Sequence, residues 1–360
     1  MAKIKMGIVG TSDWTEMMYL RPLSSHPGVE MAAICARNPV RTAKVAARYR
    51  IPGTYTDWSR MIGEASLDAV AVVTPEASHH DICVASLRAG LDVLCEKPLA
   101  ANADEAWNMV RVAEETGRKT QVFFTWRWQP HYRFIKELLA RGELGVPRRA
   151  ELSFRGAFVR DSAYHWRLDP RMAKGTIADL GAHMFDMGNW LFGPAQTLFA
   201  SSATIVDRTG IPGHEETPTN DSATILARFG PGVEAVLDVS AATPVGDRHM
   251  DIRVRVEGDA GTIECDQTFK GRDAGLVFRL AKGTEPFADL VVPEEHYAGE
   301  TFGDAFDFYL RTSTGVRYFV DCLAADVTPE PSFRDGALVQ DAIDAAMIST
   351  AENRRVAVSS

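Results

Sequence analysis

A lysine in the string Glu96-Lys97-Pro98 follows the apolar run of residues 91–95. In parallel α/β sheets, ligands bind outside the carboxyl ends of the strands, so a lysine at this place can meet a bound ligand. Its ammonium group could stabilise negative charge that develops on an oxygen atom. The alternative is an ordinary solvated lysine at a strand end.

A second polar set combines one imidazole with two carboxylates. Asp179 and His183 are four residues apart, which places both on one face of a helix, and Asp186 follows one turn later. The neighbouring residues are apolar, so this polar stripe is either a satisfied core network or a site. A neutral histidine titrates in the range needed to accept a hydroxyl proton. A metal site is a further alternative, although no thiolate or second histidine supports zinc.

The turn after the first apolar run could hold a dinucleotide. It reads Gly10-Thr11-Ser12-Asp13-Trp14. In the fingerprint Gly-x-Gly-x-x-Gly, the glycines permit a tight turn and a close approach to the pyrophosphate. Here Ser12 and Thr15 replace the second and third glycines. The turn stays small and polar, and a helix N-terminus favours phosphate, so we expect it to bind the cofactor; a plain strand-turn-helix is the alternative.

The end of the second apolar run bears on the choice of cofactor. It reads Cys35-Ala36-Arg37-Asn38, with Arg41 three residues further on. An acidic residue here would bind the ribose hydroxyls of NAD, whereas arginines accommodate the 2′-phosphate of NADP. No carboxylate is present, so we expect NADP, with NAD still possible. Two solvated arginines at a helix start are the alternative.

Two longer strings resemble the Gfo/Idh/MocA family of oxidoreductases, which includes glucose-fructose oxidoreductase and inositol dehydrogenases. The residues that match its Thr-Pro…His and Ala-Gly-x-x-Val-x-x-Glu-Lys-Pro strings are Thr74, Pro75, His79, Ala89, Gly90, Val93, Glu96, Lys97 and Pro98. The residues that match its Gly-Gly-Gly-x-x-x-Asp-x-Gly-x-His-x-x-Asp string are Gly175, Asp179, Gly181, His183 and Asp186. Glu76, Lys174 and Thr176 depart from the family pattern.

The resemblance implies a set of site residues. Lys97 and His183 would be the cation and the acid/base of hydride transfer, and Asp179 would bind a neighbouring substrate hydroxyl or orient Lys97. The expected cofactor contacts are Gly10, Thr11, Ser12, Asp13, Trp14, Ala36, Arg37, Asn38, Arg41, Thr74, Pro75, Glu76, His79, Glu96 and Lys97. The expected substrate contacts are Arg127, Trp166, Arg167, Asp179 and His183. No metal is expected.

These residues need a two-part framework. Up to about residue 125, short apolar runs alternate with helical stretches, which predicts a doubly wound parallel sheet. The predicted strands are 4–9, 29–34, 69–73, 93–95 and 121–124, and the predicted helices, each opened by a capping residue, are 38–49, 78–89 and 102–116.

From residue 126 to 332 the pattern becomes that of a mainly antiparallel sheet in an α+β domain. Its predicted strands are 150–158, 198–206, 223–229, 234–240, 251–257, 261–265 and 276–280. Helices are expected at 303–309 and 317–325, and a last helix, 333–352, is expected to join the cofactor domain, residues 1–125. The second domain would bind substrate and mediate self-association.

Composition narrows the function further. The chain has 360 residues, a net charge of −9 and five cysteines without Cys-x-x-Cys spacing. We therefore expect no nucleic-acid or membrane partner and a cytoplasmic location, and the resemblance implies a homodimer or homotetramer. The predicted activity is NAD(P)-dependent hydride transfer to or from a sugar, cyclitol or related polyol. The alternatives are cofactor-retaining, redox-assisted glycoside elimination, a non-catalytic sugar or cofactor sensor, and metal-assisted hydrolysis.

Overall fold

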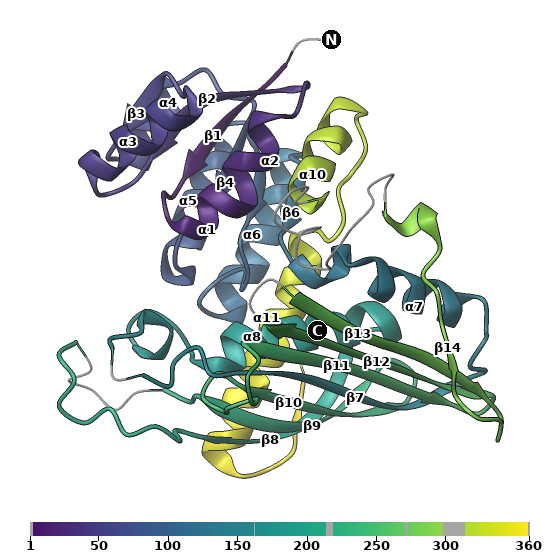
Figure 1. The fold of residues 1–360 in the computed structure, drawn as a ribbon. Coiled ribbons are helices and arrows are strands. Elements are labelled where there is room, and N and C mark those ends of the chain that lie inside the picture. Colours follow the sequence, from purple (N-terminus) through teal and green to yellow (C-terminus); the bar gives the residue numbers. More distant parts are fainter. Residues whose placement is uncertain (1–2, 162, 214–218, 271–272, 298–313, 359–360) are drawn as a thin grey trace. The chain divides into compact units, whose positions relative to one another are not determined.

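The computed structural model describes residues 3–161, 163–213, 219–270, 273–297 and 314–358. The chain divides into two compact units, each built on one sheet (Figure 1). The first unit is Met1–Phe124 with Asp307–Ala337, and the second is Thr125–Phe306 with Leu338–Ser360.

The first unit contains a six-stranded parallel sheet in the order β3-β2-β1-β4-β5-β6. Its strands are β1 (Ile4–Val9), β2 (Val29–Cys35), β3 (Gly53–Tyr55), β4 (Ala69–Val72), β5 (Asp92–Cys95) and β6 (Thr120–Val122). All four residues of β4 are buried, as expected for a strand covered on both faces. The predicted doubly wound sheet is confirmed. The sequence analysis missed β3 because its three residues are too short for a periodic pattern.

Helices connect these parallel strands. They are α1 (Asp13–Thr15), η1 (Glu16–Leu20), α2 (Arg21–Ser24), α3 (Pro39–Tyr49), α4 (Trp58–Glu64), η2 (Glu76–Ser78), α5 (His79–Arg88) and α6 (Ala103–Thr116). Asn38 and Asn102 cap α3 and α6 as predicted, each accepting a backbone N–H bond. Ser78 occupies the N-cap position of α5 as predicted, but its side chain caps no backbone N–H there, and its hydroxyl donates to Thr74 Oγ1 at 2.8 Å.

The second unit contains a nine-stranded sheet in the order β14-β13-β12-β11-β7-β10-β9-β8-β15. Among the described residues of this unit, the β7–β10 pairing alone is parallel, which confirms the mainly antiparallel prediction. The strands are β7 (Pro147–Gly156), β8 (Ala195–Ala203), β9 (Ser222–Phe229), β10 (Val233–Ser240), β11 (Met250–Gly258), β12 (Gly261–Lys270), β13 (Asp273–Lys282), β14 (Ala288–Asp289) and β15 (Val356–Ala357).

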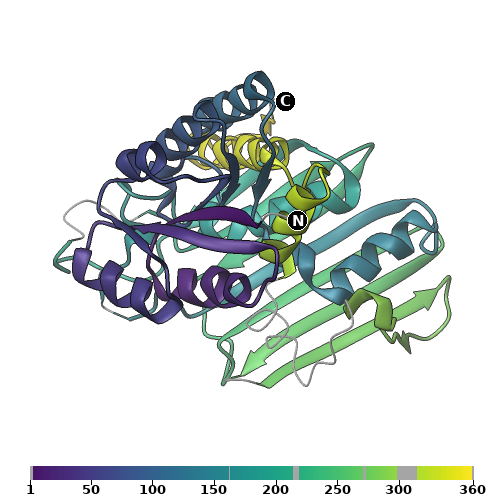
Figure 2. The ribbon, with the colours of Figure 1, turned by 90° about the horizontal axis from the view of Figure 1, so that it is seen from above.

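Helices α7 and α8 of the second unit pack on this sheet. Helix α8 (Thr176–Phe192) lies against β7, β9 and β10. Helix α7 (Pro130–Ala140), which the sequence analysis did not foresee, packs Phe134 edge-on against Phe278 of β13 and lies alongside the long strands of the sheet in Figure 2. Short 3₁₀ turns η3 (Thr125–Trp128), η4 (Trp166–Leu168) and η5 (Glu294–Tyr297) complete this unit.

The C-terminal segments divide between the units differently from the expected organisation. Helix α10 (Thr314–Ala324) belongs to the first unit, where the Gln121 side chain donates to the carbonyl of Gly315 at 2.9 Å. Only the start of α11 (Phe333–Glu352) belongs there too. The rest joins the second unit, where Ser349 accepts from the backbone of Ala200 in β8. The helix expected at 303–309 lies outside the described residues.

Candidate active site

The turn after β1 has the backbone geometry that close approach of a ligand requires. Gly10 has φ +130°, and a Cβ there would lie 2.2 Å from the carbonyl oxygen of Val73. Only glycine fits this position. Ser12 caps the helical segment that follows by accepting from Thr15 N at 3.1 Å, and the buried Thr15 packs where the third fingerprint glycine would lie. Ser12, Asp13 and Trp14 are exposed.

A buried carboxylate ties this turn to the end of β5. Glu96 Oε1 accepts from Trp14 Nε1 at 2.6 Å and from Tyr19 Oη at 2.8 Å. Burial raises the pKa of Glu96, and the hydrogen bond from Trp14 and the nearby Lys97 charge act in the opposite direction. Glu96 was expected to touch the cofactor. Its Oε1 instead binds the helical segment α1–η1 through Trp14 and Tyr19.

His79 links two strand ends of the same sheet. Its Nδ1 lies 3.0 Å from the carbonyl oxygen of Pro98, and its Nε2 lies 2.8 Å from that of Thr74. Burial lowers the pKa of His79, against the effect of these carbonyls. His79 therefore holds the Thr74-Pro75 turn after β4 next to the Lys97-Pro98 turn after β5. Glu76 is also buried, and Lys97 is half-buried directly beyond β5.

Both predicted arginines lie at the end of β2. Arg37 is exposed after the half-buried Ala36, and Arg41 lies in the first turn of α3. The side chain of Asn38 accepts from Arg41 N at 3.0 Å. The guanidinium of Arg41 donates to the carbonyl of Thr11 and pairs with Asp13. The structure therefore brings the two predicted cofactor segments of the first unit together.

In the second unit, helix α8 begins at a glycine that no other residue could replace without strain. Gly175 has φ +74°, and a Cβ there would lie 2.4 Å from the carbonyl oxygen of Asn220. Asn220 also accepts from the backbone of Ile177 at 2.9 Å. Lys174, which departs from the family's glycine run, pairs with Asp344 of α11 at 2.6 Å. The start of α8 is therefore fixed from two sides.

His183 lies on α8 in an aromatic environment. It is 6% exposed, with Trp126 edge-on at a ring centroid distance of 6.1 Å and Phe154 of β7 at 6.0 Å. These rings restrict the rotation of the imidazole.

Asp179, one turn earlier on α8, forms an ion pair with Arg167 at 3.0 Å. The guanidinium of Arg167 also stacks over the ring of Trp166 at 4.6 Å. Three residues expected to touch substrate are thus assembled in one cluster within the second unit. Arg167 remains exposed, so this cluster faces solvent on one side.

Asp186 and Arg127, by contrast, form a buried pair. The guanidinium donates to both carboxylate oxygens, with distances of 2.6 to 3.0 Å. Arg127, expected to contact substrate, therefore connects η3 to α8. Both carboxylates of α8 that the sequence singled out are thus paired with arginines, Asp186 with Arg127 and Asp179 with Arg167.

Sequence reasoning missed Tyr19 and Asn220. Tyr19 is fully buried, and burial raises its pKa well above the usual value, with the Glu96 charge adding to this effect. The only signal was a tyrosine within the apolar string Met17-Met18-Tyr19-Leu20. Asn220 lies far from α8 in sequence, so no local pattern could have indicated it.

Comparison with known proteins gives the class. Residues 4–124 match the family model "Oxidoreductase family, NAD-binding Rossmann fold", and residues 132–264 match the "GFO/IDH/MocA C-terminal domain". The chain is thus a two-domain oxidoreductase with an NAD-binding Rossmann fold. It belongs to the Gfo/Idh/MocA family, as the sequence strings indicated. No helix in the described part of the chain is long and apolar enough to cross a membrane.

Individual relatives share between about a fifth and a third of their aligned residues with this chain. The D-apiose dehydrogenase of Paraburkholderia graminis is 27% identical over 92% of this chain and 84% of that protein. The D-xylose 1-dehydrogenase (NADP(+)) 2 of Haloferax volcanii is 33% identical over 49% of this chain and 54% of that protein. A levoglucosan dehydrogenase in complex with NADH and L-sorbose has the same fold, with a TM-score of 0.87 at 21% identity and full coverage of both chains.

Proposed function

We propose that the protein transfers a hydride between NADP and a secondary hydroxyl carbon of a sugar, cyclitol or related polyol. The observation that carries the proposal is the presence of a half-buried Lys97 beyond β5 together with His183 on α8, held between aromatic rings. The relatives that are named as dehydrogenases of apiose and xylose support the substrate class.

The residues of the first unit fit a dinucleotide. A side chain at Gly10 would collide with the carbonyl of Val73, so the backbone alone lines the turn at that point. The exposed Ser12 and Asp13 begin the helical segment that follows, and the N–H groups at a helix start would favour an anionic phosphate. When bound, the nicotinamide ring supplies the two-electron acceptor or donor.

This chain's own residues handle the proton and the charge. In the oxidation direction, His183 accepts the proton of the substrate hydroxyl while the hydride leaves the carbon that bears this hydroxyl. The Lys97 ammonium stabilises the alkoxide that develops on the oxygen. Asp179, oriented by Arg167, accepts a hydrogen bond from a neighbouring hydroxyl, and the ring of Trp166 packs against the substrate. In the reduction direction, His183 returns the proton.

NADP is the proposed cofactor. No carboxylate ends β2 to bind the ribose hydroxyls, and Arg37 and Arg41 are both near its carboxyl end. The name of the Haloferax volcanii xylose dehydrogenase specifies NADP, whereas the levoglucosan dehydrogenase structure holds NADH. The two arginines, which are residues of this chain, favour NADP.

The test is a screen of the purified protein with NADP and NAD against sugars, inositols and their oxidised forms, followed by the absorbance of reduced nicotinamide. We expect net NADPH formation with at least one polyol and a higher kcat/KM for NADP than for NAD. Release of a glycosidic substituent without net reduced cofactor would replace this proposal with redox-assisted elimination. Binding without turnover would favour a sensor.

We further propose that the protein is a cytoplasmic homodimer or homotetramer that associates through its second sheet. All five cysteines are buried thiols, as is usual in a reducing compartment. Leu226 of β9 is 45% exposed, and it lies in register with Phe199 of β8 and Val236 of β10. We expect Leu226→Lys to lower the molar mass measured by light scattering.

A further inference from the structure

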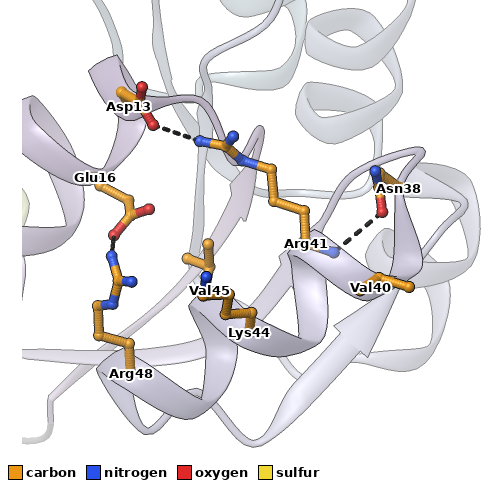
Figure 3. A pocket seen from close by; sticks show the side chains of 8 residues that line it. All are labelled: Asp13, Glu16, Asn38, Val40, Arg41, Lys44, Val45 and Arg48. Carbon is orange, nitrogen blue, oxygen red and sulfur yellow. Dashed lines mark hydrogen bonds and ion pairs between the residues drawn. The ribbon is translucent and has the colours of Figure 1, made fainter.

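Two ion pairs join the helical segment α1–η1 to α3, and the residues of both pairs line a pocket of about 460 Å³ (Figure 3). Asp13 pairs with Arg41, and Glu16 pairs with Arg48. Asn38 and Lys44 also line this pocket. The pocket therefore begins where β2 passes into α3, the place at which a dinucleotide fold holds the 2′ position of the adenosine ribose.

Arg41 is held in place before any ligand arrives. Its Nε donates to the carbonyl of Thr11, and its Nη2 lies 2.6 Å from Asp13 Oδ1. These two contacts use two of the five N–H donors of a guanidinium. A phosphate is best bound by two parallel N–H donors, so the carboxylate of Asp13 occupies a donor that a 2′-phosphate would use.

We propose that Asp13 is a specificity-determining residue that competes with the 2′-phosphate of NADP for Arg41. This inference rests on the proposed NADP site, in which Asp13 would oppose the binding of the 2′-phosphate to Arg41. The Asp13 side chain is 98% exposed, so water and salt weaken its attraction to Arg41, and a phosphate can displace it. Asp13 therefore lowers the preference for NADP without abolishing it, and leaves the affinity for NAD nearly unchanged.

The test compares dissociation constants for NADPH and NADH, measured by titration calorimetry in the wild type and in Asp13→Asn. The substitution keeps the size of the side chain and removes its charge. We expect it to raise the preference for NADPH over NADH by about twofold to fivefold, the range of an exposed ion pair. A lower preference for NADPH would overturn the inference, because Asp13 would then be orienting Arg41 for the phosphate.

Two further variants make the test specific. In an Arg41→Ala background, Asp13→Asn should have no effect on the preference; a gain that persists there means direct repulsion of the phosphate and overturns the competition. Glu16→Gln is the matched control, since it removes the other cross-helix carboxylate in the same pocket. We expect it to leave the preference unchanged, and an equal gain would overturn the inference.

The same measurements separate this inference from the proposed function. If Arg41→Ala leaves the preference for NADPH unchanged, the proposed NADP site itself fails. If Arg41→Ala weakens NADPH binding tenfold or more while Asp13→Asn has no effect, only the role of Asp13 fails. Support for the inference requires both responses.

Discussion

Two ion pairs, one in each unit, join an arginine to an aspartate at the same distance of 2.6 Å. In the first unit, Arg41 and Asp13 are 43% and 98% exposed. In the second, Arg127 and Asp186 are 8% and 2% exposed. Water screens the first pair and is excluded from the second, so burial rather than distance decides what each pair does. The exposed pair can exchange partners with a ligand, whereas the buried pair holds α8 in place.

The largest expected effect follows from breaking the buried pair. Asp186→Ala leaves the guanidinium of Arg127 buried without its carboxylate, and we expect it to lower the free energy of unfolding by about 3–5 kcal/mol. Urea denaturation followed by circular dichroism measures this loss.

The matched control is Asp13→Ala in the exposed pair. It should leave the urea midpoint unchanged, because water replaces the partner of Arg41. Equal losses in the two variants would contradict the distinction between the pairs.

The next effect concerns the buried network of the first unit. Tyr19→Phe keeps the ring that packs edge-on against Phe123 and removes the hydroxyl that donates to Glu96 at 2.8 Å. We expect a loss of roughly 1.5–3 kcal/mol in the free energy of unfolding, the range for a hydrogen bond to a charged group. A Tyr19→Phe protein as stable as the wild type would show that Glu96 does not depend on this donor.

How much of this the sequence could predict depends on the range of the interaction. The longer β-strands, the caps at Asn38 and Asn102, and the placement of Lys97 beyond β5 follow from local patterns, whereas the short strands β3, β14 and β15 do not. The Tyr19–Glu96 bond spans 77 residues, and the Arg127–Asp186 bonds span 59, so no periodicity reveals them. Sequence reasoning therefore assigned Arg127 to substrate and Glu96 to cofactor, while the fold engages both in contacts within the protein.

The smallest expected effect on stability near neutral pH comes from two buried titratable groups, whose pKa values are shifted in opposite directions. Burial lowers the pKa of His131 in α7 to about 3, below the usual value of about 6.5. Its contribution to stability is present above about pH 6.5 and is lost as the pH falls toward the folded-state pKa. Burial raises the pKa of Glu96 above its usual value of about 4.3, so its contribution is present below that value and is lost as the pH rises through the folded-state pKa.

Unfolding free energies across the acid range would separate these two groups. Relative to wild type, His131→Gln should gain stability as the pH falls, and Glu96→Gln should gain stability as the pH rises. If both variants follow the wild-type pH profile, then neither burial effect contributes to stability.

The proposed function assigns Lys97 and His183 to the same hydride transfer. The direct measurement is kcat for Lys97→Met, His183→Asn and the double variant, with NADPH affinity measured in each. We predict that each single variant loses about 10²- to 10⁴-fold in kcat, that His183→Asn keeps its NADPH affinity, and that the double variant stays within about tenfold of the slower single one. Near-normal turnover in either single variant, or a double variant whose loss is the full product of the two, would contradict this assignment.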